Sequence, residues 1–416
     1  MTRLTGPPAP ATGTPDPPLG PAPARRTPRL LFVDRFVPAD EPGTPVVVWR
    51  HLNRLEADGW RVRVAAFGPE RPAVSPPSWQ TVPYPPRRWW WPPHRALLPG
   101  SLGVRAALQA RVIVAALGGD VPDVVLTTLS PEFSAVAAAV ARRLRRPLAV
   151  LVHDQPELWE SVVGNPSGQR RVARQVRAVL RHAARVYPVT QALGEAYGPA
   201  VAANAHRLLP IPAGGAPTPA EWSPRFARPH VVHAGSLHPF QRPNLEAVAR
   251  ALAPVGGRLT VISHHDTAPF EDVARAFGHV SIRPAFPSSE EVLAYCAAEA
   301  SALLVSYSFD EQPWAATSFP SKMVEFAHLG LPQLVLAPPH AAVSVWAREH
   351  GWTSHAEALD ADALLAEVAA LASPEGWARR AGDARRAAAG PFDPDAIHAG
   401  FAESLGTLLP AALRRG

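Results

Sequence analysis

Residues 318–336, with the sequence SFPSKMVEFAHLGLPQLVL, decide the fold class of this chain. Apolar residues recur at helical spacing over 321–329, and Gly330 and Pro332 are typical of the residues that end a helix. The apolar run 333–336 that follows predicts a buried strand, and a similar run precedes the helix. A strand, a helix and a strand in this order form a βαβ unit, in which the two strands are parallel.

The same alternation continues outward along the chain in both directions. Strands are predicted at 29–34, 61–67, 81–84, 123–128, 148–153, 185–189, 229–235, 258–263, 279–283 and 302–306. Helices are predicted at 46–58, 102–117, 131–145, 170–184, 191–197, 245–252, 269–277, 289–298, 341–350, 361–371, 374–389 and 395–409. A stretch rich in Pro, Ala and Gly at 211–228 separates two runs of alternating elements. We therefore predict an α/β protein with two Rossmann-like, doubly wound domains, at 29–210 and 211–390, that face a central cleft.

The bulk composition agrees with a two-domain globular protein. The chain has 416 residues, of which 47% are hydrophobic and 18% charged, and single cores seldom exceed ~250–300 residues. The single cysteine, Cys296, excludes an intramolecular disulfide and fits a reducing cytoplasm. No apolar run approaches the ~18–20 residues that span a bilayer. Residues 1–28 are rich in Pro and lack the apolar core of a secretory signal, so we expect a disordered tail and a cytoplasmic protein.

Positive charge is concentrated in the amino-terminal half and is supplied almost wholly by arginine. The net charge is +6, with 22 Arg against 13 acidic residues over 29–205 and 16 basic against 21 acidic residues over 206–416. This distribution favours contact of the first half with an anionic surface or acceptor. No compact basic motif is present, so nucleic acid is not an expected partner. Lys322 is the single lysine among 41 basic residues, which indicates either a site that requires a compact ammonium or chance.

Ser321, Lys322 and Glu325 lie at the start of the helix predicted at 321–329. Ser321 is a candidate N-cap, and the unpaired N–H groups and positive end of a helix suit phosphate. Lys322 adds a positive charge at the same place. The carboxylate of Glu325, one turn further, is placed to accept hydrogen bonds from both hydroxyls of a ribose. The alternative is an ordinary capped helix in which Glu325 completes a capping box.

Residues 318–336 resemble the donor-binding motif of the retaining GT-B glycosyltransferases of family 4, or group 1. In that motif a Pro-Ser-Lys segment and a helix lead to a glutamate, then to Gly-x-Pro and an apolar strand. HAGSLHPFQRPNLEAV at 233–248 is similar to the opening of the donor domain, and LVHDQPE at 151–157 is similar to a His-Asp segment of the acceptor domain. The resemblance implies a GT-B fold in which the first domain binds the acceptor and the second the donor. It also implies that a terminal helix, at 391–416, packs back on the first domain.

The resemblance implies a role for each matching residue of the second domain. Glu325 would bind the donor ribose, and Ser321, Lys322 and nearby N–H groups would meet the diphosphate or the sugar. Gly235 would let the phosphates approach the backbone closely. Arg242, seven residues beyond this glycine, would supply a phosphate-neutralising cation.

Four further positions bear on the transferred sugar. The resemblance places His153 across the cleft near that sugar, whereas a hydrogen-bonded structural histidine is the alternative. Asp154, the next residue, would orient or charge it. Thr317 stands where the family has a second glutamate, and Ser236 stands where it often has an arginine. These two departures leave open the identity of the sugar and the alternative of a catalytically impaired relative.

Several other polar residues precede or follow predicted elements. His264 opens a His-His-Asp run after a strand, where a base or ribose contact is expected, and a transition-metal pair is the alternative. The aspartate pairs at 360–362 and 393–395 resemble metal-binding Asp-x-Asp motifs, but each stands before a helix, which favours N-capping. Gly43 and Thr44 resemble the loop that faces the cleft in this fold. We expect no metal site.

Trp89, Trp90 and Trp91 follow two arginines in a Pro-rich loop, a composition typical of membrane-interface contacts; an apolar packing loop is the alternative. The resemblance implies a glycosyltransferase that moves a sugar, with retention, from a nucleoside diphosphate to a carbohydrate or lipid-linked glycan acceptor. We expect it to act without a cofactor in polysaccharide or glycoconjugate biosynthesis, in the cytoplasm or at the inner face of the membrane. Two alternatives stay open: a non-hydrolysing sugar-nucleotide epimerase and a non-catalytic protein that binds a sugar nucleotide.

Overall fold

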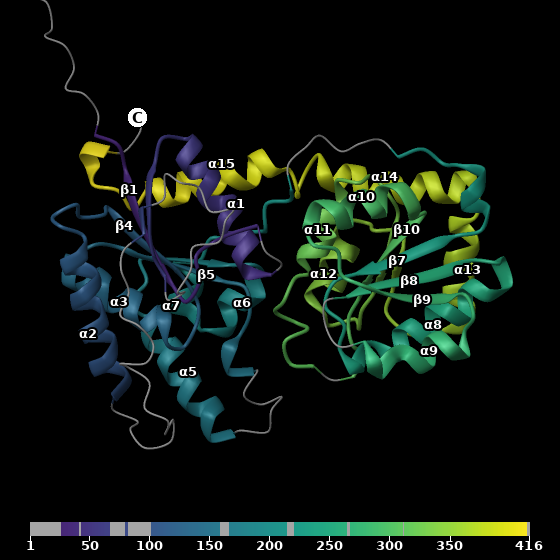
Figure 1. The fold of residues 1–416 in the computed structure, drawn as a ribbon, viewed down its shortest axis with the longest axis horizontal. Coiled ribbons are helices and arrows are strands. Elements are labelled where there is room, and N and C mark those ends of the chain that lie inside the picture. Colours follow the sequence, from purple (N-terminus) through teal and green to yellow (C-terminus); the bar gives the residue numbers. More distant parts are fainter. Residues whose placement is uncertain are drawn as a thin grey trace, which may run out of the picture.

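The structure, a computed structural model, consists of two α/β domains that lie side by side (Figure 1). It describes residues 26–40, 43–66, 80–81, 101–158, 166–213, 220–263, 267–310 and 312–413. The tryptophans at 89–91 and the first 25 residues of the expected tail lie outside these ranges. Residues 26–28 lead into the first strand, and Arg26 forms an ion pair of 2.6 Å with Asp123.

The first domain is built on a parallel sheet of six strands in the order β3-β2-β1-β4-β5-β6. Its strands are β1 (Arg29–Asp34), β2 (Arg61–Ala66), β3 (Gln80–Thr81), β4 (Val124–Thr128), β5 (Leu148–Val152) and β6 (Arg185–Pro188). Its helices are α1 (Thr44–Ala57), α2 (Ser101–Ala116), α3 (Phe133–Leu144), α5 (Pro166–Leu180), α6 (Gln191–Ala196) and α7 (Pro199–Ala202). The central strands are buried on both faces, as expected when helices cover a parallel sheet on either side.

The second domain repeats this plan with a parallel sheet in the order β12-β11-β10-β7-β8-β9. Its strands are β7 (His230–Ala234), β8 (Arg258–Ser263), β9 (Val280–Pro284), β10 (Ala302–Ser306), β11 (Gln333–Leu336) and β12 (His355–Ala356). Its helices are α8 (Arg242–Leu252), α9 (Glu271–Ala276), α10 (Ser289–Glu299), α11 (Ser321–Ala327), α12 (Ala342–Glu349), α13 (Ala361–Leu371) and α14 (Pro374–Ala388). Both sheets therefore have the doubly wound strand order, and the prediction of two Rossmann-like domains is confirmed.

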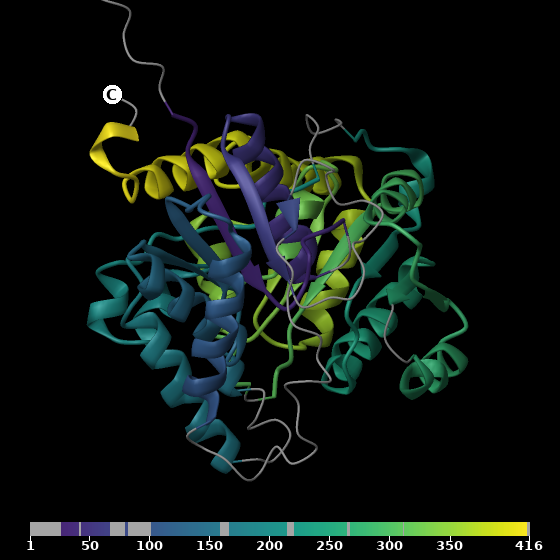
Figure 2. The ribbon, with the colours of Figure 1, turned by 60° about the vertical axis from the view of Figure 1, so that its left-hand side comes forward.

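The last long helix, α15 (Pro394–Gly406), packs on the first domain although it follows the second in sequence. Phe401 and Leu405 join the same buried cluster as Leu52 of α1. Arg54 forms an ion pair of 2.6 Å with Asp395, also between α1 and α15. Helices α14 and α15 consequently lie along one edge of the molecule and connect the two domains (Figures 1 and 2). No helix of the described residues has both the length and the apolar character needed to cross a membrane.

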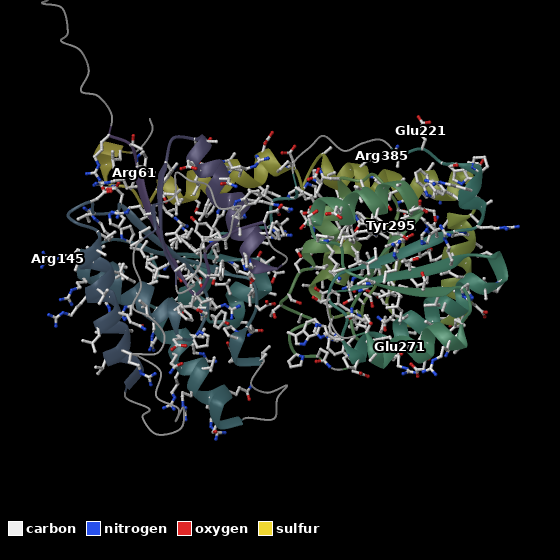
Figure 3. The ribbon with its side chains drawn as sticks, viewed as in Figure 1. Arg61, Arg145, Glu221, Glu271, Tyr295 and Arg385 are labelled. Atoms are coloured by element: carbon white, nitrogen blue, oxygen red, sulfur yellow. The ribbon has the colours of Figure 1, made fainter. Side chains whose placement is uncertain are left out.

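The strand order fixes where a ligand is expected. In each sheet the order reverses next to the first strand, between β1 and β4 and between β7 and β10, which opens a crevice at the carboxyl ends of these strands. Gly235 directly follows β7, and His153 directly follows β5. Arg61 and Arg145 lie at the edge of the first domain that is turned away from the second domain (Figure 3).

Candidate functional site

Two adjoining pockets lie between the domains. The Glu325 pocket is lined by Gly43, Val46, Val47, Arg50, Pro210, Ala234, Gly235, Ser236, Ile262, Ala285, Phe286, Ser288, Ser289, Val292, Leu293, Ser321, Lys322, Glu325 and Phe326. The His153 pocket is lined by Gly43, Thr44, Val47, His153, Asp154, Gln155, Leu158, Val189, Pro210, Ser236, His238, Phe240, Gln241, Val305, Ser306, Tyr307, Trp314, Ser318, Phe319, Pro320, Ser321 and Lys322. The two pockets share Gly43, Val47, Pro210, Ser236, Ser321 and Lys322, so they meet between the start of α1 and the start of α11.

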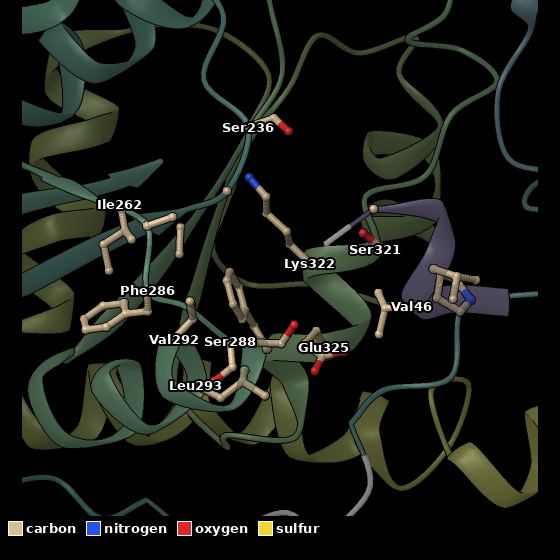
Figure 4. A pocket seen from close by; sticks show the side chains of 18 of the residues that line it. Val46, Ser236, Ile262, Phe286, Ser288, Val292, Leu293, Ser321, Lys322 and Glu325 are labelled. Carbon is tan, nitrogen blue, oxygen red and sulfur yellow. The ribbon is translucent and has the colours of Figure 1, made fainter. Parts of the chain in front are cut away.

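Gly235 and Lys322 are in direct contact at this meeting point. The φ angle of Gly235 is 131°, a region that residues with a side chain rarely adopt. A Cβ atom at Gly235 would lie 2.1 Å from Cε and 2.4 Å from Nζ of Lys322. The lysine side chain extends from α11 toward Ser236 in the gap that the glycine leaves (Figure 4). The glycine is therefore required for the position of the lysine as well as for the turn after β7.

The ammonium of Lys322 is held in a packed environment without a compensating acid among the described residues. No hydrogen bond or ion pair of its side chain is present within these residues. Burial lowers its pKa from 10.5 to about 8. A cation kept at a pocket wall at this energetic cost is well placed to meet an anionic ligand.

Glu325 lies one helical turn after Lys322 and bridges the two domains. Its carboxylate forms an ion pair of 2.6 Å with Arg50 of α1 and accepts a hydrogen bond of 3.1 Å from the backbone N–H of Ala213. Arg50 also donates to the carbonyl of Ile211 at 3.0 Å. The capping-box alternative is wrong, because α11 has no side-chain cap and the Glu325 carboxylate binds Arg50 and Ala213 instead. The sequence did not predict Arg50, which is 275 positions from Glu325.

The other wall of the Glu325 pocket is apolar. Ile262 at the end of β8 and Phe286 after β9 lie on the side opposite α11 (Figure 4), and Leu293 of α10 also lines the pocket. Phe326 of α11 adds a second ring to the lining. A flat apolar group fits between such walls, while its polar substituents reach the carboxylate of Glu325 and the ammonium of Lys322.

His153 and Asp154 stand at the first-domain wall of the His153 pocket. Burial lowers the pKa of His153 to about 4, so its imidazole is neutral at physiological pH. Burial raises the pKa of Asp154, although this side chain opens into the pocket. Gly43 and Thr44, at the start of α1, line the same pocket, as the prediction of a cleft-facing loop requires.

Thr317 does not line either pocket but lies immediately behind the lining. It is buried, and its hydroxyl donates to Oε1 of Gln155 at 2.8 Å. The hydroxyl of Thr190 donates to the carbonyl of Thr317 at 2.6 Å. Both partners belong to the first domain, so Thr317 ties the loop before α11 to the facing domain.

Two predictions about individual residues need correction. Pro320, not Ser321, occupies the N-cap position of α11, and Ser321 is the first helical residue and faces both pockets. Arg242 lies outside both linings; it begins α8 and forms ion pairs with Glu246, at 2.9 Å, and with Asp272, at 2.5 Å. These two acids hold its guanidinium on the outer side of the helix. Among the described residues, the pockets therefore bring together the predicted residues Gly43, Thr44, His153, Asp154, Gly235, Ser236, Ser321, Lys322 and Glu325, but neither Arg242 nor Thr317.

The candidate metal motifs of the sequence serve as helix caps. Asp360 accepts a hydrogen bond from the N–H of Ala363, and Asp393 accepts from the N–H groups of Asp395 and Ala396. The described residues contain no group of three acidic, histidine or cysteine side chains arranged to hold a metal ion. His264 lies outside the described residues, so its predicted contact with the base or ribose stays a prediction.

The comparison with known proteins agrees with this geometry. Residues 43–214 match the family model described as "Glycosyl transferase 4-like domain". This part of the chain is therefore similar to the glycosyl transferase 4-like domains. The matched range includes Gly43, His153 and Asp154, which line the His153 pocket. No curated protein has a significantly similar sequence.

Solved structures extend the similarity to nearly the whole chain. Sucrose-phosphate synthase from Thermosynechococcus elongatus has a TM-score of 0.64 at 16% identity, with 92% of this chain and 99% of the other covered. HepE of Anabaena, solved in complex with UDP-glucose, has a TM-score of 0.62 at 16% identity, with 91% and 99% covered. A glycosyltransferase from Rickettsia africae has a TM-score of 0.63 at 10% identity, with 92% and 99% covered. The chain thus has the GT-B fold and is similar to the group 1, family 4-like glycosyltransferases.

Proposed function

We propose that this protein transfers a sugar from a nucleoside diphosphate to an acceptor hydroxyl held in the cleft. The observation that carries the proposal is the unpaired ammonium of Lys322, held over Gly235 at the junction of the two pockets. A diphosphate at this junction would place its nucleoside in the Glu325 pocket and its sugar in the His153 pocket. The glycosyltransferase 4-like first domain supports the same reaction class.

Both parts of the nucleoside, the base and the ribose, would have a matching wall in the Glu325 pocket. The base would lie against Phe286 and Leu293, and the ribose hydroxyls would donate to the carboxylate of Glu325. Because Arg50 and Ala213 already occupy this carboxylate, the ribose must share or displace their hydrogen bonds. Donor binding would therefore act directly on a contact between the two domains.

The chemistry of transfer follows from the charges at the junction. As the bond between sugar and phosphate breaks, negative charge grows on the departing diphosphate, and a preorganised ammonium stabilises it most where water is excluded. Lys322 would supply this charge without a metal ion. The neutral His153 would accept or donate a hydrogen bond to the sugar rather than repel the developing positive charge at the anomeric carbon.

The resemblance of 318–336 to the retaining enzymes supports transfer with retention to a carbohydrate or lipid-linked acceptor. A lipid-linked acceptor would bring the protein to the inner face of the membrane, with Trp89, Trp90 and Trp91 as the candidate contact. Polysaccharide or glycoconjugate biosynthesis is the process that such a reaction would serve.

Turnover separates this proposal from its two alternatives. We expect release of a nucleoside diphosphate from a UDP-, GDP- or ADP-hexose to depend on an added acceptor, and chromatography of the products to show a new glycoside. Interconversion of two sugar nucleotides without acceptor would instead establish an epimerase. Tight binding without either reaction would establish a non-catalytic binding protein.

The pKa of Lys322 gives a pH dependence with a definite sign. Its folded pKa of about 8 lies below the ordinary value of 10.5, so the unfolded chain binds the proton more tightly. Between pH 8 and pH 10.5 the stability of the folded protein therefore rises with pH, because the folded state no longer buries a charged lysine. Over the same range the neutral lysine no longer attracts the diphosphate. We expect nucleoside diphosphate affinity, measured by calorimetry, to fall about fivefold between pH 8 and pH 9.

Lys322→Met is the control for this pH dependence. Its affinity should be weak and nearly constant over the same range, because methionine carries no titrating charge. A wild-type affinity that stays constant from pH 7 to pH 9.5 would contradict the assignment of Lys322 to the diphosphate.

A further inference from the structure

One wall of the His153 pocket is built from aromatic rings of the second domain. The rings of His238 and Phe240, in the loop after β7, are stacked with centroids 5.1 Å apart. Trp314, in the loop after β10, packs against Phe240 at 5.8 Å and against Tyr307 at 5.5 Å. All four residues line the pocket, and Phe240 and Trp314 are only half-buried. They form a continuous row, which we call the ring wall.

The first domain contributes the polar side chains of His153, Asp154 and Gln155 to the lining of the same pocket. Asp154 opens into the pocket, and none of the described residues forms a hydrogen bond or ion pair with its carboxylate. Burial raises the pKa of Tyr307, and the nearby carboxylate of Asp154 raises it further. Asp154 and Tyr307 line the same pocket, and this coupling indicates that they lie close to each other. Lys322 is the single lysine or arginine of the lining.

The volume of the His153 pocket is about 330 Å³, comparable with the ~300–1,000 Å³ of small-molecule sites. A donor sugar bound next to Lys322 would take only the end of the pocket at α11. The remaining space is lined by rings and a free carboxylate and has no further fixed positive charge. Its occupant must therefore be neutral, offer an apolar face to the rings and offer a hydroxyl to the carboxylate.

We propose that the acceptor presents a neutral hydroxylated ring, which stacks on Phe240 and Trp314 and donates a hydrogen bond to Asp154. This inference rests on the proposed transfer reaction and specifies its acceptor class. A pyranose and a phenolic ring share the required chemistry, namely an apolar face and a hydroxyl at the rim. An open-chain polyol has the hydroxyls but lacks the face, and an anionic acceptor would be repelled by Asp154.

The test is ligand-observed saturation-transfer NMR on the full chain, in the presence of whichever of UDP, GDP or ADP binds. The probes are methyl β-D-glucopyranoside, 4-methoxyphenol and sorbitol. We expect saturation transfer to one or both ring probes and none to sorbitol, and the stronger ring probe distinguishes a sugar from an aromatic acceptor. In Trp314→Leu and Phe240→Leu, ring binding should weaken about two- to tenfold, as for the loss of one aromatic contact.

Trp222→Leu is the matched control, because Trp222 is a half-buried tryptophan of the same domain outside both linings. It should leave ring binding unchanged, and all three variants should keep the wild-type nucleotide affinity. Equal saturation transfer to sorbitol and the ring probes, or ring binding that survives both ring-wall variants, would overturn the inference while nucleotide binding persists. If none of UDP, GDP and ADP binds the wild type, the proposed function is overturned instead.

Discussion

Gly235→Ala is expected to abolish donor nucleotide binding and to lower the melting temperature. Alanine at a φ of 131° is strained, and such strain costs about 1–3 kcal/mol. In addition, the new Cβ would lie 2.1 Å from Cε of Lys322, so the lysine must leave its position. The nucleotide then loses both the close approach to the backbone and the ammonium, and calorimetry should detect no binding where the wild type binds.

Gly198→Ala separates strain from collision. Gly198 has a φ of 100°, and nothing lies within 4 Å of a Cβ placed there. This variant should lose stability by a similar amount in thermal unfolding but bind nucleotide like the wild type, since it precedes α7 and lies outside both pockets. If Gly235→Ala binds nucleotide with unchanged affinity, Gly235 and Lys322 do not form the phosphate site.

Glu325→Ala is expected to weaken nucleotide binding about 10- to 150-fold, the loss that corresponds to hydrogen bonds with a charged group, worth ~1.5–3 kcal/mol. The carboxylate also pairs with Arg50, so a loss of affinity by itself does not distinguish a ribose contact from a structural ion pair. Arg50→Met resolves the two roles, because it breaks the same ion pair while it leaves the carboxylate free for a ribose.

Glu325→Ala and Arg50→Met should have similarly lowered melting temperatures but different nucleotide affinities. Both lose an ion pair between domains, whose partners are 10% and 19% exposed, so thermal unfolding should show a lower melting temperature for each. Nucleotide affinity should fall in Glu325→Ala but stay equal or increase in Arg50→Met. Equal losses of affinity in the two variants would mean that the ion pair, and not a ribose contact, explains the effect of Glu325.

The alternation of elements and several of the polar residues that line the pockets could be predicted from the sequence, because both depend on local patterns. The glycine after β7, the histidine after β5 and the start of α11 each follow a strand or precede a helix, and parallel strands bring such points to the carboxyl edge of their sheet. Lys322 was noticeable because the chain otherwise uses only arginine. These signals require no knowledge of contacts between distant residues.

The contacts that tie the domains together could not be predicted in this way. Gln155 meets Thr317 across 162 positions, and no local pattern distinguishes Gln155 from other polar residues after a strand. For Arg242, a local pattern led to a wrong prediction. Its position after Gly235 suggested a phosphate contact, but side chains at a helix start are directed by their own surroundings, and here Glu246 and Asp272 attract the guanidinium away from the cleft.

Calorimetric titration of wild type and Glu325→Ala with UDP-, GDP- and ADP-glucose tests the central claim, that the Glu325 pocket holds the nucleotide of a sugar donor. We predict that at least one of these donors binds the wild type and that its affinity falls at least tenfold in Glu325→Ala, the lower end of the loss expected for a charged hydrogen bond of roughly 1.5 kcal/mol. Absence of binding to the wild type by all three, or equal affinity in the variant, would contradict the account.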